Sequence, residues 1–131
     1  MMPPELAALS ATAILHFVTI FVSQRFLTRD VGRAGNMGTR ENLEAQLSPL
    51  TLRLRRATAN FVENISPFII AVVVVVLADK TSTLTAALAW GFVAARVLYV
   101  PAYALEWVPG RSLIWLAGMI CTTGLLVLGW I

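Results

Sequence analysis

Apolar residues occur in four long runs, each interrupted by few or no charges. Every run approaches the roughly 20 residues that an α-helix needs to cross a bilayer. The pattern predicts membrane spans at about residues 6–26, 49–78, 84–104 and 111–131, with a basic loop at 27–48. Hydrophobic residues make up 58% of the chain and charged residues 13%, a composition unlike that of a soluble domain.

Short polar segments mark the predicted helix boundaries. Ser48-Pro49 is typical of a helix start, with serine as N-cap and proline at the first helical position. The glycine-containing stretch Thr28 to Asn36 indicates a loop, and Glu106 to Gly110 indicates the last connection. Little sequence remains outside the spans. Residues 1–131 are therefore expected to form one all-α integral membrane domain, a four-helix transmembrane bundle.

The net charge of +3 is concentrated in arginines of the first connection. Positively charged loops stay on the cytoplasmic side, so the 1–2 and 3–4 loops are expected inside and both termini outside. The first residues carry no positive charge, which favours a retained first span over a secretory leader. No base-stacking aromatics accompany the arginines, so we expect no nucleic-acid partner. Cys121 is the only cysteine and His16 has no partner at ligand spacing, so no metal site is predicted.

A polar stripe interrupts the second apolar run. Arg56, Asn60, Glu63 and Pro67 recur at offsets that place them on one face of a helix. An asparagine and a glutamate at the start of a membrane helix are costly unless protein, water or a ligand satisfies them. A functional site is the default interpretation of such groups. The alternative is a structural ion-pair network that joins Arg56 and Glu63 to Arg96.

A second stripe is expected at the same membrane face. Arg96, Tyr99 and Tyr103 share one face of the third helix, which runs antiparallel to the second. Arg111 begins the fourth helix on that side. Arginines beside asparagine, glutamate and tyrosines suit a small anionic ligand with peptide-like donors and acceptors.

These motifs resemble those of the MAPEG family, the membrane-associated proteins of eicosanoid and glutathione metabolism. The resemblance rests on Arg56 to Asn64 followed by Pro67-Phe68, and on Ala95 to Tyr99 with Tyr103. The RxxxNxxE element paired with RxxY is fairly specific, whereas either alone is weak. Arg111 with Ser112, in the segment Pro109 to Ser112, looks like the Arg-Ser pair at the head of span 4 in the prostaglandin E synthase branch. Among members of this family, the chain looks like a bacterial one.

The resemblance implies a homotrimer in the bacterial inner membrane, in contact with lipids, that binds glutathione as co-substrate between protomers near the cytoplasmic face. It implies no metal. Arg111 would be catalytic, because a cation near the sulfur lowers the pKa of the thiol. The implied glutathione-binding residues are Arg53, Arg56, Asn60, Glu63, Arg96, Tyr99, Tyr103 and Ser112.

Three functions are compatible with the sequence. The first is a glutathione-dependent transferase or peroxidase of the microsomal type, acting on a hydrophobic small-molecule electrophile that arrives from the lipid. The second is a non-catalytic member that binds a lipid or presents it to a partner enzyme. The third is a small four-span exporter, but such proteins typically place the essential carboxylate in span 1, and here the predicted span 6–26 has none. The complete stripe and Arg111 favour the first.

Overall fold

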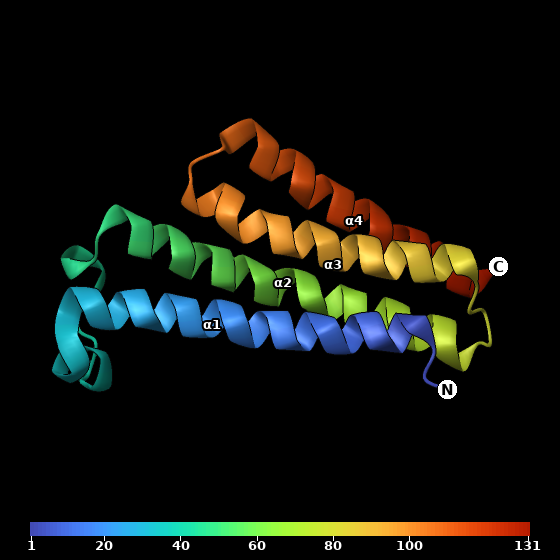
Figure 1. Ribbon diagram of the computed structural model, residues 1–131, viewed down its shortest axis with the longest axis horizontal. Helices are drawn as coiled ribbons and strands as arrows, with labels where there is room; N and C mark the ends of the chain where they lie inside the picture. Colours follow the sequence, from blue (N-terminus) through green and yellow to red (C-terminus); the bar gives the residue numbers. More distant parts are fainter.

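The computed structural model describes all residues, 1–131, and its regular elements are all helices. In chain order they are α1 (Pro4–Met37), the 3-10 helix η1 (Glu44–Gln46), α2 (Pro49–Leu77), α3 (Thr83–Ala104) and α4 (Val108–Trp130). The α-helices pack as a bundle, with consecutive helices running in opposite directions (Figure 1). All four are long and apolar enough to cross a membrane. The predicted all-α bundle of four membrane-length helices is confirmed.

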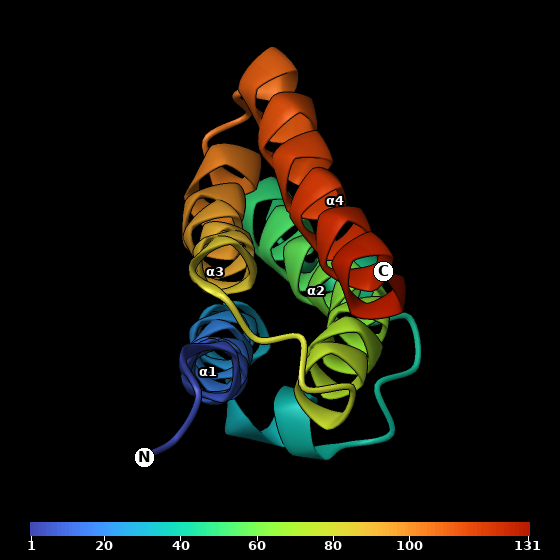
Figure 2. The same ribbon diagram turned by 90° about the vertical axis from the view of Figure 1, so that its right-hand side faces the viewer.

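The connections divide between the two ends of the bundle. The α1–α2 connection and the α3–α4 turn lie at one end, and both termini lie at the other with the α2–α3 turn (Figure 1). Viewed along the bundle, α1 and α4 lie on opposite sides, with α2 and α3 between them (Figure 2). The start of α2, the end of α3 and the start of α4 therefore share one end of the bundle, as the antiparallel order predicted.

Apolar side chains from all four helices form the core. Phe68 of α2 stacks on Phe92 of α3 with ring centroids 4.0 Å apart, and Ala8 and Leu125 pack around them from the outer helices. Many large apolar side chains instead point outward, such as Phe21, which is 73% exposed. Exposed apolar surface of this extent is expected where lipid replaces water around a membrane helix.

The first connection differs from the prediction. Thr28 to Asn36, expected to be a loop, is helical, because α1 continues to Met37. Of the glycines in this segment, only Gly32 departs from helical geometry. Its φ of 72° and ψ of 175° change the direction of the helix at that residue. The Asn36 amide donates to the Thr28 hydroxyl across this break at 2.9 Å, so the helix resumes beyond it.

The length of α1 places its last part outside the apolar stretch. Up to the break at Gly32, the 28 residues 4–31 would span about 42 Å at 1.5 Å per residue, against roughly 30 Å for the hydrocarbon core. The charged residues from Arg25 onward belong to this extra length. In Figure 1 this end of α1 and the start of α2 extend beyond the α3–α4 turn.

The fourth helix also begins earlier than predicted, at Val108 instead of near Arg111. Pro109 occupies the first turn, where its missing N–H would have had no helical partner in any case. Gly110 is buried beneath the Trp107 ring, and a Cβ there would lie only 2.2 Å from ring atom Cδ2. The absence of a side chain at Gly110 thus allows the tight entry into α4.

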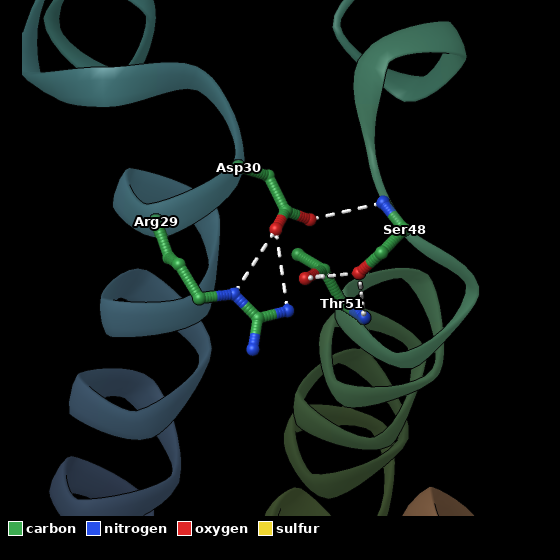
Figure 3. A network of polar contacts seen from close by, with 4 residues as sticks. All are labelled: Arg29, Asp30, Ser48 and Thr51. Atoms are coloured by element: carbon green, nitrogen blue, oxygen red, sulfur yellow. Dashed lines mark hydrogen bonds and ion pairs between the residues drawn. The ribbon is translucent and has the colours of Figure 1, made fainter.

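A hydrogen-bond network joins α1 to the start of α2 (Figure 3). Ser48 is the predicted N-cap of α2, and its hydroxyl accepts from the Thr51 backbone N–H at 3.3 Å. The Ser48 N–H donates to Asp30 Oδ2 at 2.9 Å, while Arg29 donates to Asp30 Oδ1. This carboxylate therefore fixes where α2 starts relative to α1.

A buried carboxylate ties the helices together at the other end. Glu5 of α1 is 1% exposed, and it accepts from the Thr85 hydroxyl and from the Ser82 backbone N–H in the first turn of α3. A negative charge is favourable at a helix N-terminus, where backbone N–H groups point outward. Ser82 and Thr85 also form a reciprocal capping box. The start of α3 is thus fixed against α1.

Prolines lie inside two of the helices, Pro67 in α2 and Pro101 in α3, and both helices continue through them. Each proline removes one backbone donor from the helical ladder. The buried packing of the next residue, Phe68, helps to hold α2 together at that point.

Candidate functional site

An open cavity of about 670 Å³ lies where α2, α3 and α4 meet. Its lining combines charged and polar side chains with apolar ones, among them a tryptophan and a leucine of the fourth helix. The lining residues are Arg56, Ala59, Asn60 and Glu63 from α2, Tyr99 and Tyr103 from α3, and Arg111, Ser112, Trp115 and Leu116 from α4.

Helical spacing explains how three helices present these side chains to one space. On α2, Arg56, Asn60 and Glu63 follow one another at intervals of four and three residues, so they share a face. Tyr99 and Tyr103 are likewise one turn apart on α3. Both stripes predicted from the sequence thus contribute to the cavity lining, and of their members only Pro67 and Arg96 do not line it.

The charged side chains of the cavity form no ion pair with one another. Salt bridges in the protein join only Arg29 to Asp30 and Arg53 to Glu106. Arg56 and Glu63 are exposed, and neither makes a side-chain hydrogen bond within the chain. The alternative of a structural ion-pair network is therefore not what the structure contains. These groups remain available to a ligand of mixed charge.

Arg111 contacts an aromatic ring at the cavity wall. Its guanidinium carbon lies 4.6 Å from the centroid of the Tyr103 ring, a distance at which a cation is attracted to the π-face. Arg111 belongs to the first turn of α4, one residue after the buried Gly110. Its position thus depends on both the α3–α4 turn and the Tyr103 ring.

Arg96 lies behind the cavity wall rather than in it. The residue is 2% exposed and does not line the cavity. Its Nη1 donates to Asn60 Oδ1 at 3.1 Å, and its guanidinium lies between the rings of Phe61 at 4.8 Å and Tyr99 at 4.4 Å. Its Nε and Nη2 are buried without hydrogen-bond partners. The structure thus shows Arg96 in contact with Asn60, and its direct contact with glutathione stays a prediction.

Stacked rings and guanidinium groups continue across all four helices. Tyr99 and Tyr103 have ring centroids 5.8 Å apart, and His16 of α1 stacks on Phe61 with centroids 4.8 Å apart. We call the whole series the aromatic–cation column. In order from α1 to α4 it comprises His16, Phe61, Arg96, Tyr99, Tyr103 and Arg111.

Arg53 is engaged with the end of α3. Its Nε donates to the Ala104 carbonyl at 3.1 Å, and its Nη1 pairs with Glu106 Oε1 at 2.9 Å. Arg53 does not line the cavity. Its observed contacts join α2 to the α3–α4 turn, and glutathione binding by this residue stays a prediction.

Sequence reasoning missed part of the apolar side of the cavity. Trp115 and Leu116 lie four residues after Arg111 and Ser112, so helical spacing alone could have placed them there. Phe61, which holds Arg96 in place, resembled an ordinary core residue in the sequence. No group of three histidine, cysteine, aspartate or glutamate side chains lies close enough together to hold a metal ion.

Comparison with known proteins agrees with the sequence motifs. The family model described as the MAPEG family matches residues 6–131, which is nearly the whole chain. A search of curated proteins and a search of solved structures each returned no match.

Proposed function

Because the chain belongs to the MAPEG family, whose members are membrane proteins of glutathione or eicosanoid metabolism, we propose that it is a glutathione-dependent transferase or peroxidase. Its second substrate is a lipophilic electrophile that reaches the site from the membrane. Glutathione binds in the cavity between α2, α3 and α4, near the cytoplasmic face. The active assembly is a homotrimer in a bacterial inner membrane, with both termini outside.

One observation carries this proposal: cations and an anion without ionic partners share a cavity with apolar side chains. Arg56 matches a carboxylate of glutathione, Arg111 matches its thiolate, and Glu63 matches its ammonium group. Trp115 and Leu116 provide an apolar wall for the electrophile on the other side. A peptide thiol and an apolar partner can therefore meet in one place.

Arg111 is the residue that we assign to activation of the sulfur. A nearby cation lowers the pKa of a thiol, and the start of a helix adds a favourable partial charge. In a transferase reaction the thiol releases its proton to solvent, and the thiolate attacks the electrophilic carbon. A carbon–sulfur bond forms as the bond to the leaving group breaks and that group departs with the electron pair.

The proposal is tested with the full chain purified in detergent. Glutathione binding is measured by titration calorimetry, and conjugation is measured with a generic aryl halide and, separately, as reduction of a lipid hydroperoxide. We expect saturable binding and at least one of the two activities. Binding without either activity would favour the non-catalytic alternative, and absence of both binding and activity would refute the proposal.

A further inference from the structure

We propose that Arg96 is a positioning residue that fixes the orientation of the Asn60 amide, so that Asn60 offers only hydrogen-bond donors to the cavity. The group bound at Asn60 is then an oxygen acceptor of the ligand, such as a carboxylate or a peptide carbonyl. The inference rests on the proposed function where it takes glutathione as that ligand. It assigns Arg96 a role without ligand contact.

Two neighbouring donors, Arg96 and Asn64, determine that the oxygen of the Asn60 amide, and not its NH₂ group, faces them. Arg96 Nη1 lies 3.1 Å from Oδ1 of Asn60, and Asn64 Nδ2 lies 3.3 Å from the same atom. A guanidinium can only donate hydrogen bonds, so the atom facing it must be the acceptor oxygen. The NH₂ group of Asn60 makes no hydrogen bond within the chain, although the residue lines the cavity. Its two donors are therefore left for a ligand.

The environment of Arg96 shows why this contact is rigid. The side chain is nearly completely buried, and aromatic rings of Phe61 and Tyr99 flank the guanidinium. Cation–π contacts partly replace the hydrogen bonds that Nε and Nη2 lack. A buried arginine with two unpaired nitrogens is a costly way to stabilise a helix pair, and an apolar residue would pack there at lower cost. The arrangement is better explained by the orientation it imposes on Asn60.

The test is a double-mutant cycle on glutathione affinity, with Arg96→Met, Asn60→Ala and the double variant in the full chain. Calorimetry gives Kd, and thermal unfolding gives Tm for each protein. We expect Arg96→Met to weaken binding about tenfold, as loss of one charge-assisted hydrogen bond would. Asn60→Ala should weaken it similarly, and the double variant should be no weaker than Asn60→Ala alone. If the fold-changes in Kd of the two single variants multiply, to about a hundredfold in the double variant, the inference is overturned, because Arg96 and Asn60 then contact the ligand independently.

Melting temperature separates positioning from a merely structural role. Methionine removes the unpaired donors without leaving a large cavity, so Tm should stay constant or rise while Kd weakens. A loss of Tm with unchanged Kd would contradict positioning. Arg33→Met, at an exposed arginine that does not line the cavity, is the matched control and should alter neither value.

A second variant keeps the test valid if Arg96→Met does not fold. Phe61→Leu removes one ring from the guanidinium and leaves Arg96 itself in place. It should weaken glutathione binding in the wild-type background and have no further effect in the Asn60→Ala background. An equal effect in both backgrounds would overturn the inference. Wild-type protein that binds no glutathione would instead refute the proposed function, and this inference with it.

Discussion

Arg111 and Glu63 face the same cavity from different helices, and the proposed mechanism gives them different tasks. Arg111 acts on the sulfur as it loses its proton, so its effect is largest on the fraction of bound glutathione that is thiolate and able to attack. Glu63 interacts with a charge of glutathione that does not change during the reaction. Substitution of the two residues should therefore affect different kinetic constants.

Replacing Arg111 with alanine should lower kcat for conjugation by about 10²–10³-fold, the effect of removing one preorganised electrostatic group. The glutathione Kd should change by less than about threefold, because binding depends mainly on the α2 stripe. Arg111→Lys keeps the charge and should recover part of kcat. Rates equal to wild type in the alanine variant would remove Arg111 from the mechanism.

Replacing Glu63 with glutamine should raise KM for glutathione about tenfold, because a charge-assisted interaction with the ammonium group becomes a neutral one. The change should leave kcat within about twofold, since the contact is the same in ground and transition states. Steady-state kinetics at saturating aryl halide provide both constants. A fall in kcat at constant KM would assign Glu63 to the chemical step instead.

Single residues of the site were predictable where helical spacing determines their direction. Asn60 follows from an offset of four residues from Arg56, and Tyr99 and Tyr103 follow from offsets of three and seven from Arg96. Arg96 satisfies the same offset rule, yet it lies behind the cavity wall because Phe61 and Tyr99 enclose it. Periodicity gives the face of a helix but not the depth of a side chain, which depends on packing against neighbouring helices.

Among the elements, the start of α4 determines where Arg111 lies. Gly110→Ala would place a methyl group 2.2 Å from the Trp107 ring, so the ring or the turn must move. We expect a loss of about 1–3 kcal/mol in unfolding free energy from overpacking, together with reduced conjugation. Both are measured in detergent, by thermal unfolding and by the aryl halide assay.

Gly118→Ala is the matched control within the same helix. A Cβ at Gly118 meets its nearest atom, Ala95 Cβ, at 3.6 Å, which is ordinary van der Waals contact. Alanine is also the better helix former by about 1 kcal/mol. Stability should be unchanged or slightly raised and activity retained. Equal losses in both variants would show that the Trp107 contact is not the cause.

Helix boundaries were predictable where the residue at the boundary favours a single backbone conformation. They were less predictable at glycine, which is compatible with several. Ser48-Pro49 marks the start of α2 correctly, since serine caps and proline suits the first turn. Glycine at position 32 is compatible with a locally broken helix as well as with a loop. In the structure the helix continues beyond Gly32, and a hydrogen bond from Asn36 to Thr28, eight residues apart, connects the two sides of the break. The sequence contained both partners without indicating that they meet.

For the whole molecule, the alternating direction of the spans was sufficient to predict that two polar stripes and Arg111 meet at one end. The sequence did not reveal which of these groups line the cavity and which, like Arg96, are buried behind it, because this depends on how deeply four helices interlock. The homotrimer and the membrane topology stay predictions, because one depends on neighbouring chains and the other on the membrane.

Stability of the whole bundle should depend on pH through Asp30, which joins α1 to α2 beyond the apolar stretch. The Thr51 hydroxyl, and then the Ser48 backbone N–H, hold the pKa of this carboxyl well below its usual range. A lowered pKa in the folded state stabilises the protein above the unfolded-state pKa, and this contribution is lost as pH falls below about 4. Wild-type Tm should therefore decrease on acidification.

Asp30→Asn should lower Tm at pH 7, and the difference from wild type should shrink as pH falls below about 4. Thermal unfolding in detergent across this pH range measures the effect. Glu41→Gln, at an exposed carboxylate without a hydrogen-bond partner, is the control and should shift Tm little at any pH. A constant Tm difference between Asp30→Asn and wild type at all pH values would exclude this linkage.

Pro67 has a consequence for the chemistry of the cavity as well as for the helix. Its nitrogen carries no hydrogen, so the peptide oxygen of Glu63, four residues earlier, has no amide donor from that position. Glu63 lines the cavity, and Pro67 shares its face of α2. The helical ladder therefore lacks one amide donor beside Glu63, on the face of α2 whose side chains line the cavity, so the backbone there is held less by its own hydrogen bonds and more by packing against α3 and α4.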